Sequence, residues 1–127
     1  MAILCGVDII EIQRIRKSIE STGGAFKGRV YTDREILYCE SRKVVKYQSY
    51  AARFAAKEAV SKAFGTGIGK GIELKDIEIL NDDYGKPYVI LKGKARQIYN
   101  ELGGQEISLS ISHCHEYAVA YVIVQTP

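Results

Sequence analysis

Two carboxylates and a lysine are the residues of this sequence whose types and positions best suit catalysis. Asp8 lies in the apolar stretch GVDII, where an unpaired charge is unfavourable to bury. Glu58 and Lys62 are four residues apart in a segment with helical periodicity, so they share one helix face. Two carboxylates from different elements, completed by water and substrate phosphates, are typical of Mg²⁺ sites. The sequence therefore predicts a magnesium site at Asp8 and Glu58.

Simpler structural roles are open for the same residues. Asp8 could cap the helix that follows its strand. Glu58 and Lys62 could form a surface ion pair that contributes only about 0.2–0.5 kcal/mol. Phosphate-binding groups near the carboxylates would favour the magnesium site.

A glycine-rich loop, GTGIGKG at residues 65–71, follows this helix directly. Glycines such as Gly65 and Gly67 allow backbone N–H groups to approach an anion closely. The loop matches neither a Walker motif nor a dinucleotide fingerprint, and a flexible helix terminator is the alternative. Basic residues around it favour a polyphosphate ligand. They are Arg53, Lys57, Lys62 and Lys70.

His113 ends an alternating Ser-Ile segment and is followed by Cys114 and His115. A zinc site needs three or four ligands at suitable spacing, and Cys5 and Cys39 do not supply the missing ones. His113 is instead a candidate for phosphate binding or for acid–base chemistry.

The elements that must position these residues follow from hydrophobic periodicity. Ile9, Ile12, Ile15 and Ile19 recur near helical spacing, so we expect a helix there that ends before Gly23. Further helices are predicted at residues 33–40, 47–64 and 94–102, and strands at residues 3–10, 77–80, 88–91, 107–112 and 117–124. The first strand is apolar on both faces, which predicts a central, covered strand. The order of elements indicates an α+β fold with an antiparallel-leaning sheet, one long helix and several short ones.

Local signals support two of these helices. Thr32 and Glu35 have the spacing of a capping box, which predicts a helix beginning there. The long helix carries one face of methyl groups, which allows close approach to a sheet or another helix. That face consists of Ala52, Ala55, Ala56, Ala59 and Ala63.

Length and composition predict one domain over residues 1–127. The contents of 46% apolar and 26% charged residues exclude disordered, collagen-like and low-complexity classes. The longest apolar run, residues 117–124, is shorter than the roughly 20 residues of a membrane span. The three cysteines lack C-x-x-C spacing and the N-terminus lacks signal-peptide features, so we expect a cytoplasmic protein.

The net charge of +3 conceals an uneven distribution. Residues 1–64 hold twelve basic and seven acidic residues, a balance of +5, and residues 65–127 hold six and eight, a balance of −2. An anionic partner is therefore expected at the first half. The nine tyrosines and this charge also fit a small nucleic-acid-binding domain without catalysis, but no RNP, KH or zinc-knuckle motif is present. A carboxylate-pair glycosidase is a third alternative, disfavoured because the sequence has no tryptophan.

Three segments together resemble the holo-[acyl-carrier-protein] synthases, which are small phosphopantetheinyl transferases of fatty-acid synthesis. They lie in the family's order and separations, and the resemblance spans essentially the whole chain. The segments are GVDI at 6–9 leading to Arg14-Ile15, RFAAKEA at 53–59 with KAFGTG at 62–67, and SISH at 110–113 with YAVA at 117–120.

This resemblance implies transfer of 4′-phosphopantetheine from coenzyme A to a serine of apo acyl carrier protein, with release of adenosine 3′,5′-bisphosphate. It implies that Asp8 and Glu58 hold Mg²⁺ at the catalytic centre. Lys62 would then stabilise or protonate the leaving phosphate, and Glu58, or water beside it, would act as the base.

The resemblance also implies binding roles outside the catalytic centre. Arg14 matches a position that docks the acidic carrier protein, and the family assembles as homotrimers with active sites between subunits. Contacts to coenzyme A are expected from Arg53, Lys57, Lys62, Gly65, Gly67 and His113.

Overall fold

The α+β class is confirmed by a computed structural model, which describes residues 1–69 and 71–127. The strands are β1 (Ala2–Glu11), β2 (Ile77–Asn81), β3 (Pro87–Leu91), β4 (Glu106–His113) and β5 (Tyr117–Thr126). The helices are α1 (Ile12–Thr22), α2 (Ala25–Val30), α3 (Asp33–Ser41), α4 (Lys46–Ala63) and α5 (Gly93–Glu101), with 3₁₀ helices η1 (Lys43–Val45) and η2 (Leu74–Asp76). None of the described helices is long and apolar enough to cross a membrane.

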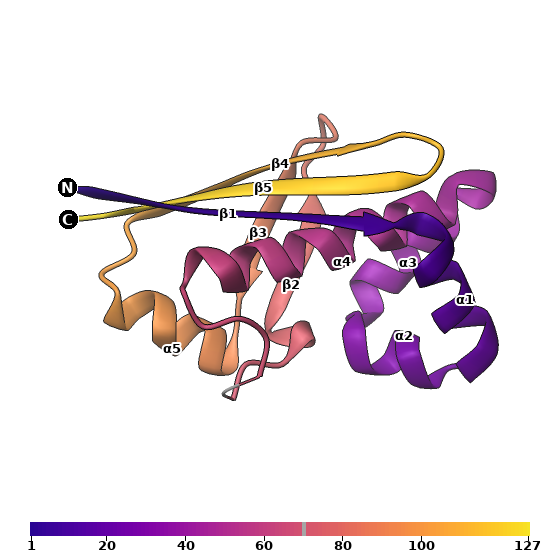
Figure 1. Cartoon of the computed structure of the whole chain (residues 1–127), viewed down its shortest axis with the longest axis horizontal. Coiled ribbons are helices and arrows are strands. Elements are labelled where there is room, and N and C mark those ends of the chain that lie inside the picture. Colours follow the sequence, from indigo (N-terminus) through magenta and orange to yellow (C-terminus); the bar gives the residue numbers. More distant parts are fainter. Residues whose placement is uncertain (70) are drawn as a thin grey trace.

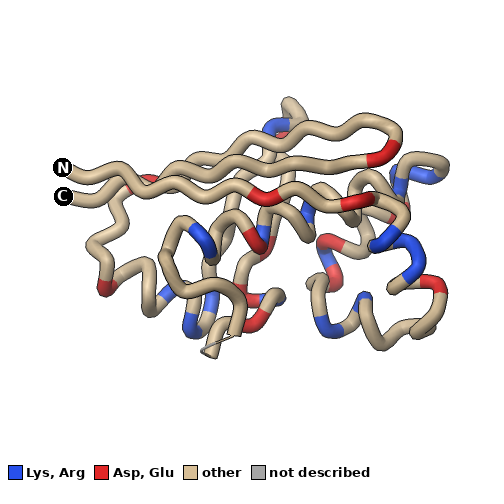
Figure 2. Tube along the Cα trace, viewed as in Figure 1, with Lys and Arg blue, Asp and Glu red and all other residues tan. Residues whose placement is uncertain are grey.

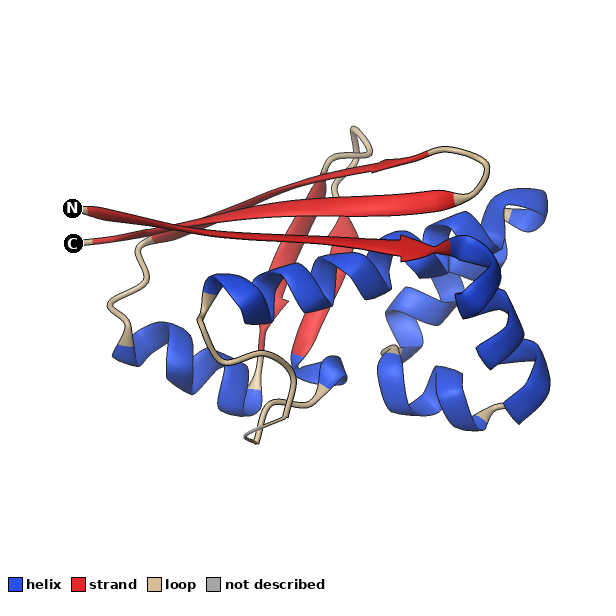
Figure 3. Ribbon diagram, viewed as in Figure 1, coloured by secondary structure: helices blue, strands red, loops and turns tan. Residues whose placement is uncertain are grey.

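The strands form two antiparallel sheets, one of three strands in the order β1-β5-β4 and one of two strands, β2-β3. Helix α4 runs along one face of the three-stranded sheet, and none of the described elements covers the other face (Figures 1 and 3). Helices α1, α2 and α3 gather at one end of α4, and the β2-β3 hairpin crosses its other side (Figure 1). Helix α4 is therefore the centre of the fold.

Most elements confirm the expectations from periodicity and capping. Ile12, Ile15 and Ile19 are the buried residues of α1, whereas Ile9 lies in β1, so the helical period begins one member later than predicted. Helix α3 begins with the expected capping box, in which the Thr32 side chain accepts from the Glu35 N–H and the Glu35 carboxylate accepts from the Thr32 N–H. The short α2 was not predicted, because its six residues include Gly28 and lack a clear apolar period.

The closest packing in the core is between β1 and α4. All five alanines of the methyl face are at most 6% exposed. Gly6 lies so near the helix that a Cβ on it would be 1.9 Å from the carbonyl oxygen of Ala59. Any larger residue at this position would push the strand away from the helix, so Gly6 sets the spacing that brings β1 onto α4.

The prediction that β1 is a central, covered strand is wrong for the single chain. Strand β1 lies at an edge of its sheet, and only the face toward α4 is covered. On the other face Ile3, Val7 and Ile9 are 51%, 52% and 62% exposed. Together with the neighbouring side chains of β5, they form an apolar surface that we call the open sheet face. It consists of Ile3, Val7, Ile9, Tyr117, Tyr121 and Ile123.

A buried carboxylate joins the β2-β3 hairpin to α3. Glu78 on β2 accepts hydrogen bonds from the Thr32 hydroxyl and the Arg34 guanidinium, and it forms an ion pair with Lys92. Burial raises the pKa of Glu78, but these three partners outweigh that effect and lower the pKa to about 2. The ionised form of Glu78 is therefore stabilised by folding.

Acid is expected to destabilise the protein because Glu78 must take up a proton. Its folded-state pKa lies below the ordinary value of about 4.3, so its contribution is complete above that pH and is lost toward about pH 2. A group of this kind adds a slope of up to about 1.4 kcal/mol per pH unit in that window. Glu78→Gln should lower the free energy of unfolding at neutral pH and flatten its fall in acid. Urea unfolding from about pH 7 to about pH 2.5 measures both, and equal acid slopes in parent and variant would contradict this.

Candidate functional site

The structure brings Asp8, Glu58 and Lys62 together at one edge of the three-stranded sheet, and we call these three residues the carboxylate site. Asp8 lies two residues after Gly6 on the face of β1 that contacts α4. Lys62 Nζ donates to Asp8 Oδ1 over 2.9 Å and to the carbonyl oxygen of Val7 over 3.1 Å. The cluster follows from the close approach of β1 to α4.

Both simpler structural alternatives are ruled out by these contacts. Helix α1 begins after Glu11 without a side-chain cap, so Asp8 does not cap it. Among the described ion pairs, Lys62 is joined to Asp8 on another element and not to Glu58 on its own helix. The carboxylate site therefore links a strand to a helix.

The electrostatics of the carboxylate site favour a bound cation. Burial raises the pKa of Glu58, nearby Asp8 raises it further, and Lys62 partly opposes the rise. The Lys62 side chain is 51% exposed, so its ammonium is accessible to a ligand as well as to Asp8. A divalent cation would relieve the repulsion between the two carboxylates more completely than one ammonium.

The donor set fits a hard cation with open coordination positions. Within the described part of the chain, no cluster of three or more His, Cys, Asp or Glu side chains is arranged to hold a metal. Asp8 and Glu58 present two carboxylates, which would leave the other positions of a bound cation to water or a ligand. Mg²⁺ commonly binds in this way, with one or two carboxylates plus phosphate oxygens.

A second polar site surrounds Arg53 at the opposite edge of the sheet. It is a pocket of about 190 Å³ that we call the Arg53 pocket. Its polar lining is Tyr38, Arg42, Ser49, Arg53, Asn81 and His113. Three basic side chains and one aromatic ring in a small pocket suit an anionic ligand that carries a ring, such as a nucleotide.

Arg53 is the most constrained member of this pocket, because it is only 4% exposed. Its guanidinium lies 4.2 Å from the centre of the Tyr38 ring, and it donates to Ser49 Oγ over 3.1 Å and to Asn81 Oδ1. Arg53 Nε is buried without a hydrogen-bond partner among the described residues. A buried donor of this kind is usually satisfied by an ordered water or by a bound group.

Comparison with known proteins identifies the family. Residues 4–122 match the model of the 4′-phosphopantetheinyl transferase superfamily. The chain belongs to this superfamily. It is 61% identical over 124 residues to the holo-[acyl-carrier-protein] synthase of Ruminiclostridium cellulolyticum, covering 98% of this chain and 92% of the relative.

Solved structures of similar proteins have the same fold as this phosphopantetheinyl transferase. Helicobacter pylori holo-[acyl-carrier-protein] synthase in complex with coenzyme A is 35% identical, with a TM-score of 0.85, covering 96% of this chain and all of that chain. The Bacillus anthracis synthase in complex with CoA (3′,5′-ADP) is 40% identical, with a TM-score of 0.81 and coverage of 99% and 100%. The predicted resemblance is confirmed.

One residue predicted to bind phosphate has a different role in the transferase. Lys57 is fully buried, and its ammonium donates to Glu35 Oε1 over 2.8 Å and to the carbonyl oxygens of Leu74 and Ile77 over 3.0 and 2.6 Å. All three N–H bonds are therefore occupied inside the protein, and the predicted phosphate contact is wrong. The prediction assumed that a charge at the flank of α4 faces solvent, but α4 is enclosed on nearly all sides.

Two backbone N–H groups of the glycine loop, predicted to contact phosphate, are bonded within the chain. The N–H of Gly65 donates to the carbonyl oxygen of Lys62, and the N–H of Gly67 donates to that of Ser61. These donors satisfy the last carbonyls of α4, and Gly65 has the positive φ of 78° that is usual at a helix end. The loop therefore ends α4 just after Lys62, and the expected contribution of Lys70 lies outside the described residues.

The sequence analysis did not identify three residues of the Arg53 pocket, because they come from three separate segments. They are Tyr38, Arg42 and Asn81. Only Asn81 carried a signal, since a polar amide stands between a predicted strand and a predicted turn.

Arg14 lies exposed on α1, near the end of β1 that carries Asp8. Basic residues recur along α1, α2 and η1, at the end of the molecule away from both termini (Figure 2).

Proposed function

We propose that Asp8, Glu58 and Lys62 form the reaction centre with which this chain, a single transferase domain, moves 4′-phosphopantetheine from coenzyme A to a serine of apo acyl carrier protein. The observation that carries this assignment is the carboxylate site, where Lys62 Nζ lies 2.9 Å from Asp8 Oδ1 beside the half-buried Glu58. The arrangement presents two carboxylates and an accessible ammonium to a phosphate ligand.

The reaction exchanges a phosphoanhydride bond of coenzyme A for a phosphoester bond to serine. The serine hydroxyl oxygen attacks the phosphorus that carries pantetheine, and a new P–O bond forms as the pyrophosphate bridge breaks. Glu58, or water beside it, takes the proton of the hydroxyl, since its carboxylate is half-buried at the reaction centre. Lys62 donates to the departing adenosine 3′,5′-bisphosphate, whose bridging oxygen gains charge as the bond breaks.

We place Mg²⁺ at Asp8 and Glu58, since two carboxylates with open positions fit this ion. When bound, it would supply positive charge to the pyrophosphate oxygens. The role of the chain is to hold the two carboxylates at a fixed spacing and to keep Lys62 beside them. That spacing depends on Gly6, whose missing side chain allows β1 to lie against Ala59.

The Arg53 pocket is proposed to hold the nucleotide end of coenzyme A. Arg53, Arg42 and His113 can contact its phosphates, and the Tyr38 ring lies next to the guanidinium of Arg53. The unpartnered Arg53 Nε provides a buried donor for a phosphate or base oxygen. The predicted coenzyme A contacts of Arg53, His113, Gly65 and Gly67 stay part of the proposal, whereas that of the fully buried Lys57 does not.

Within one chain, the carboxylate site and the Arg53 pocket are not expected to hold the same coenzyme A molecule. Asp8 lies on β1 and His113 on β4, which are the opposite edges of the sheet β1-β5-β4. The family resemblance implies a homotrimer, and we propose that in it the carboxylate site of one subunit meets the Arg53 pocket of the next. The open sheet face provides the apolar surface that such assembly would cover.

Arg14 is proposed to dock the acidic carrier protein beside the reaction centre. Arg14→Glu should raise the KM for apo carrier protein by about tenfold, because it replaces attraction with repulsion, while the KM for coenzyme A stays unchanged. Steady-state kinetics with each substrate varied in turn measures both constants. Arg96→Glu on α5 makes the same change of charge elsewhere and serves as the control. Equal rises in both KM values for Arg14→Glu would remove its docking role.

The overall proposal is tested by mass spectrometry of apo acyl carrier protein incubated with this protein, coenzyme A and Mg²⁺. The carrier should gain the mass of one phosphopantetheine group, and chelation of Mg²⁺ should prevent the gain. An unmodified carrier would refute the transfer, and modification that continues under chelation would refute the metal assignment.

We place the enzyme in the cytoplasm, where its free Cys5, Cys39 and Cys114 would stay reduced.

A further inference from the structure

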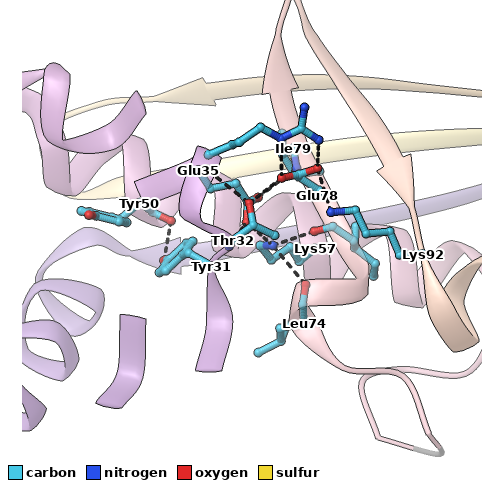
Figure 4. Close-up of polar contacts among 11 residues, drawn as sticks. Tyr31, Thr32, Glu35, Tyr50, Lys57, Leu74, Glu78, Ile79 and Lys92 are labelled. Carbon is cyan, nitrogen blue, oxygen red and sulfur yellow. Dashed lines mark hydrogen bonds and ion pairs between the residues drawn. The ribbon is translucent and has the colours of Figure 1, made fainter. Parts of the chain in front are cut away.

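Glu35 joins three elements through a single buried carboxylate. It lies in the first turn of α3 and is fully buried. Its oxygens accept from the Thr32 N–H over 2.8 Å, from the Ile79 N–H over 2.9 Å and from Lys57 Nζ over 2.8 Å (Figure 4). The Glu35 carboxylate is therefore bonded to α3, β2 and α4 at once.

The partners of Glu35 are themselves fixed by further bonds. Lys57 also donates to the carbonyl oxygens of Leu74 and Ile77, so its ammonium has no freedom to turn. The neighbouring Glu78 makes a second connection between β2 and α3 through Thr32 (Figure 4). Desolvation lowers the pKa of Lys57, while Glu35 opposes that shift, so the pair depends on each partner being present.

Each element held by Glu35 also carries a residue of the Arg53 pocket, a few positions along the chain from the group that makes the bond. On α3, Tyr38 follows Glu35 by three residues. On α4, Arg53 precedes Lys57 by four residues. On β2, Asn81 follows Ile79 by two residues. On the two helices these spacings place the pocket residue on the same side as the contact with Glu35. On β2 the bond comes from the backbone N–H of Ile79, so it holds the strand itself two residues before Asn81.

The three pocket residues in turn contact one another. The Arg53 guanidinium lies over the Tyr38 ring and donates to Asn81 Oδ1. Their contacts therefore require that α3, α4 and β2 keep one relative placement. No other carboxylate in the described part of the chain bonds to all three elements.

We infer that Glu35 is a positioning residue for coenzyme A binding, because it fixes α3, α4 and β2 so that Tyr38, Arg53 and Asn81 form one pocket. This inference rests on the proposed assignment of the Arg53 pocket to coenzyme A. Glu35 itself is fully buried and bonded only to other parts of the chain, so it acts through the pocket residues.

A buried ion pair is better suited to this role than to raising stability. Removing two charges from water offsets most of their attraction, so well-packed apolar residues often stabilise a fold as much. Directional bonds in a low-dielectric interior, however, permit only one arrangement of the groups that make them. The network of Glu35 and Lys57 therefore restricts geometry where an apolar contact would allow sliding.

The test separates geometry from stability with two variants. Glu35→Gln leaves the Lys57 charge without its partner, whereas Glu35→Gln/Lys57→Met removes both charges. We expect both variants to raise the KM for coenzyme A and the Kd for adenosine 3′,5′-bisphosphate by about tenfold, with kcat at saturating coenzyme A changed by less than about threefold. The melting temperature should fall in the single variant and recover in the double variant.

Two controls make the outcomes decisive. Tyr99→Leu weakens the contact between α5 and Phe64, away from the pocket, and should lower the melting temperature without changing the KM for coenzyme A. A KM that recovers with the melting temperature in the double variant, or that rises equally in Tyr99→Leu, would overturn the inference.

Arg53→Ala tests the assignment of the Arg53 pocket to coenzyme A. If it leaves the KM unchanged, the proposed coenzyme A site is wrong and the inference falls with it. If only Arg53→Ala raises the KM, the inference alone fails.

Discussion

Glu58→Gln is expected to lower the rate of phosphopantetheine transfer by at least about a hundredfold while leaving the fold intact. The amide cannot accept the serine proton, and general-base catalysis typically contributes about 10²–10⁴-fold. It also removes one of the two carboxylates proposed to hold Mg²⁺. Turnover of apo carrier protein, followed by mass spectrometry over a range of Mg²⁺ concentrations, measures both effects.

The melting temperature of Glu58→Gln should not fall as its activity does. Burial and nearby Asp8 both disfavour the charge on Glu58, so a neutral amide should leave the melting temperature unchanged or slightly higher. Glu20→Gln on α1 is a matched control, because it removes only an exposed ion pair with Arg16 and should leave transfer unchanged. Full magnesium-dependent activity in Glu58→Gln would refute its role as ligand and base.

Ile123→Asp is expected to separate the subunits and to abolish transfer at low protein concentration. Ile123 lies on the open sheet face, where a carboxylate would be buried without a partner in the assembled protein. Sedimentation velocity should detect monomers, and circular dichroism should detect an unchanged fold, because the side chain is 37% exposed in the single chain. Leu102→Asp is the control, since Leu102 is equally exposed beyond α5 and should leave the assembly intact. An intact, active trimer in Ile123→Asp would exclude this face as the interface.

Mixing two impaired variants at a coenzyme A concentration too low for Arg53→Ala tests the sharing of sites directly. Glu58→Gln damages the carboxylate site, and Arg53→Ala damages the Arg53 pocket. If each active site combines the two halves from neighbouring subunits, randomly mixed trimers contain roughly a quarter of sites with both halves intact. Activity should therefore reappear after subunit exchange. No recovery despite demonstrated exchange would place both halves in the same chain.

The fold was predictable where the signal lies within a few neighbouring residues. The spacing of Ile12, Ile15 and Ile19 defines the buried side of α1, and Thr32 with Glu35 marks the beginning of α3. The alternation of serine and isoleucine before His113 predicts β4. Each pattern reports local geometry, so the rest of the chain was not needed to interpret it.

The errors arise where the answer depends on distant segments. The sequence indicated that Lys57 is basic and helical, but only the positions of Glu35, Leu74 and Ile77 determine that its charge is enclosed. The apolar residues of β1 predicted that both faces of the strand are covered, but Ile3, Val7 and Ile9 are exposed in the single chain. Within one chain only one face has a covering element, and the sequence does not state whether the second cover comes from the same molecule.

The contact of Gly6 with Ala59 has a consequence for how the reaction centre responds to its ligands. Where β1 meets α4, the touching groups are backbone atoms and methyl groups, which have no rotamers to exchange. The distance between the strand that carries Asp8 and the helix that carries Glu58 therefore has very little elasticity. The charges are preorganised, so the free energy of substrate binding is not needed to bring the two carboxylates together. A rigid backbone contact between two of the smallest residues thus keeps two like charges side by side before any ligand arrives.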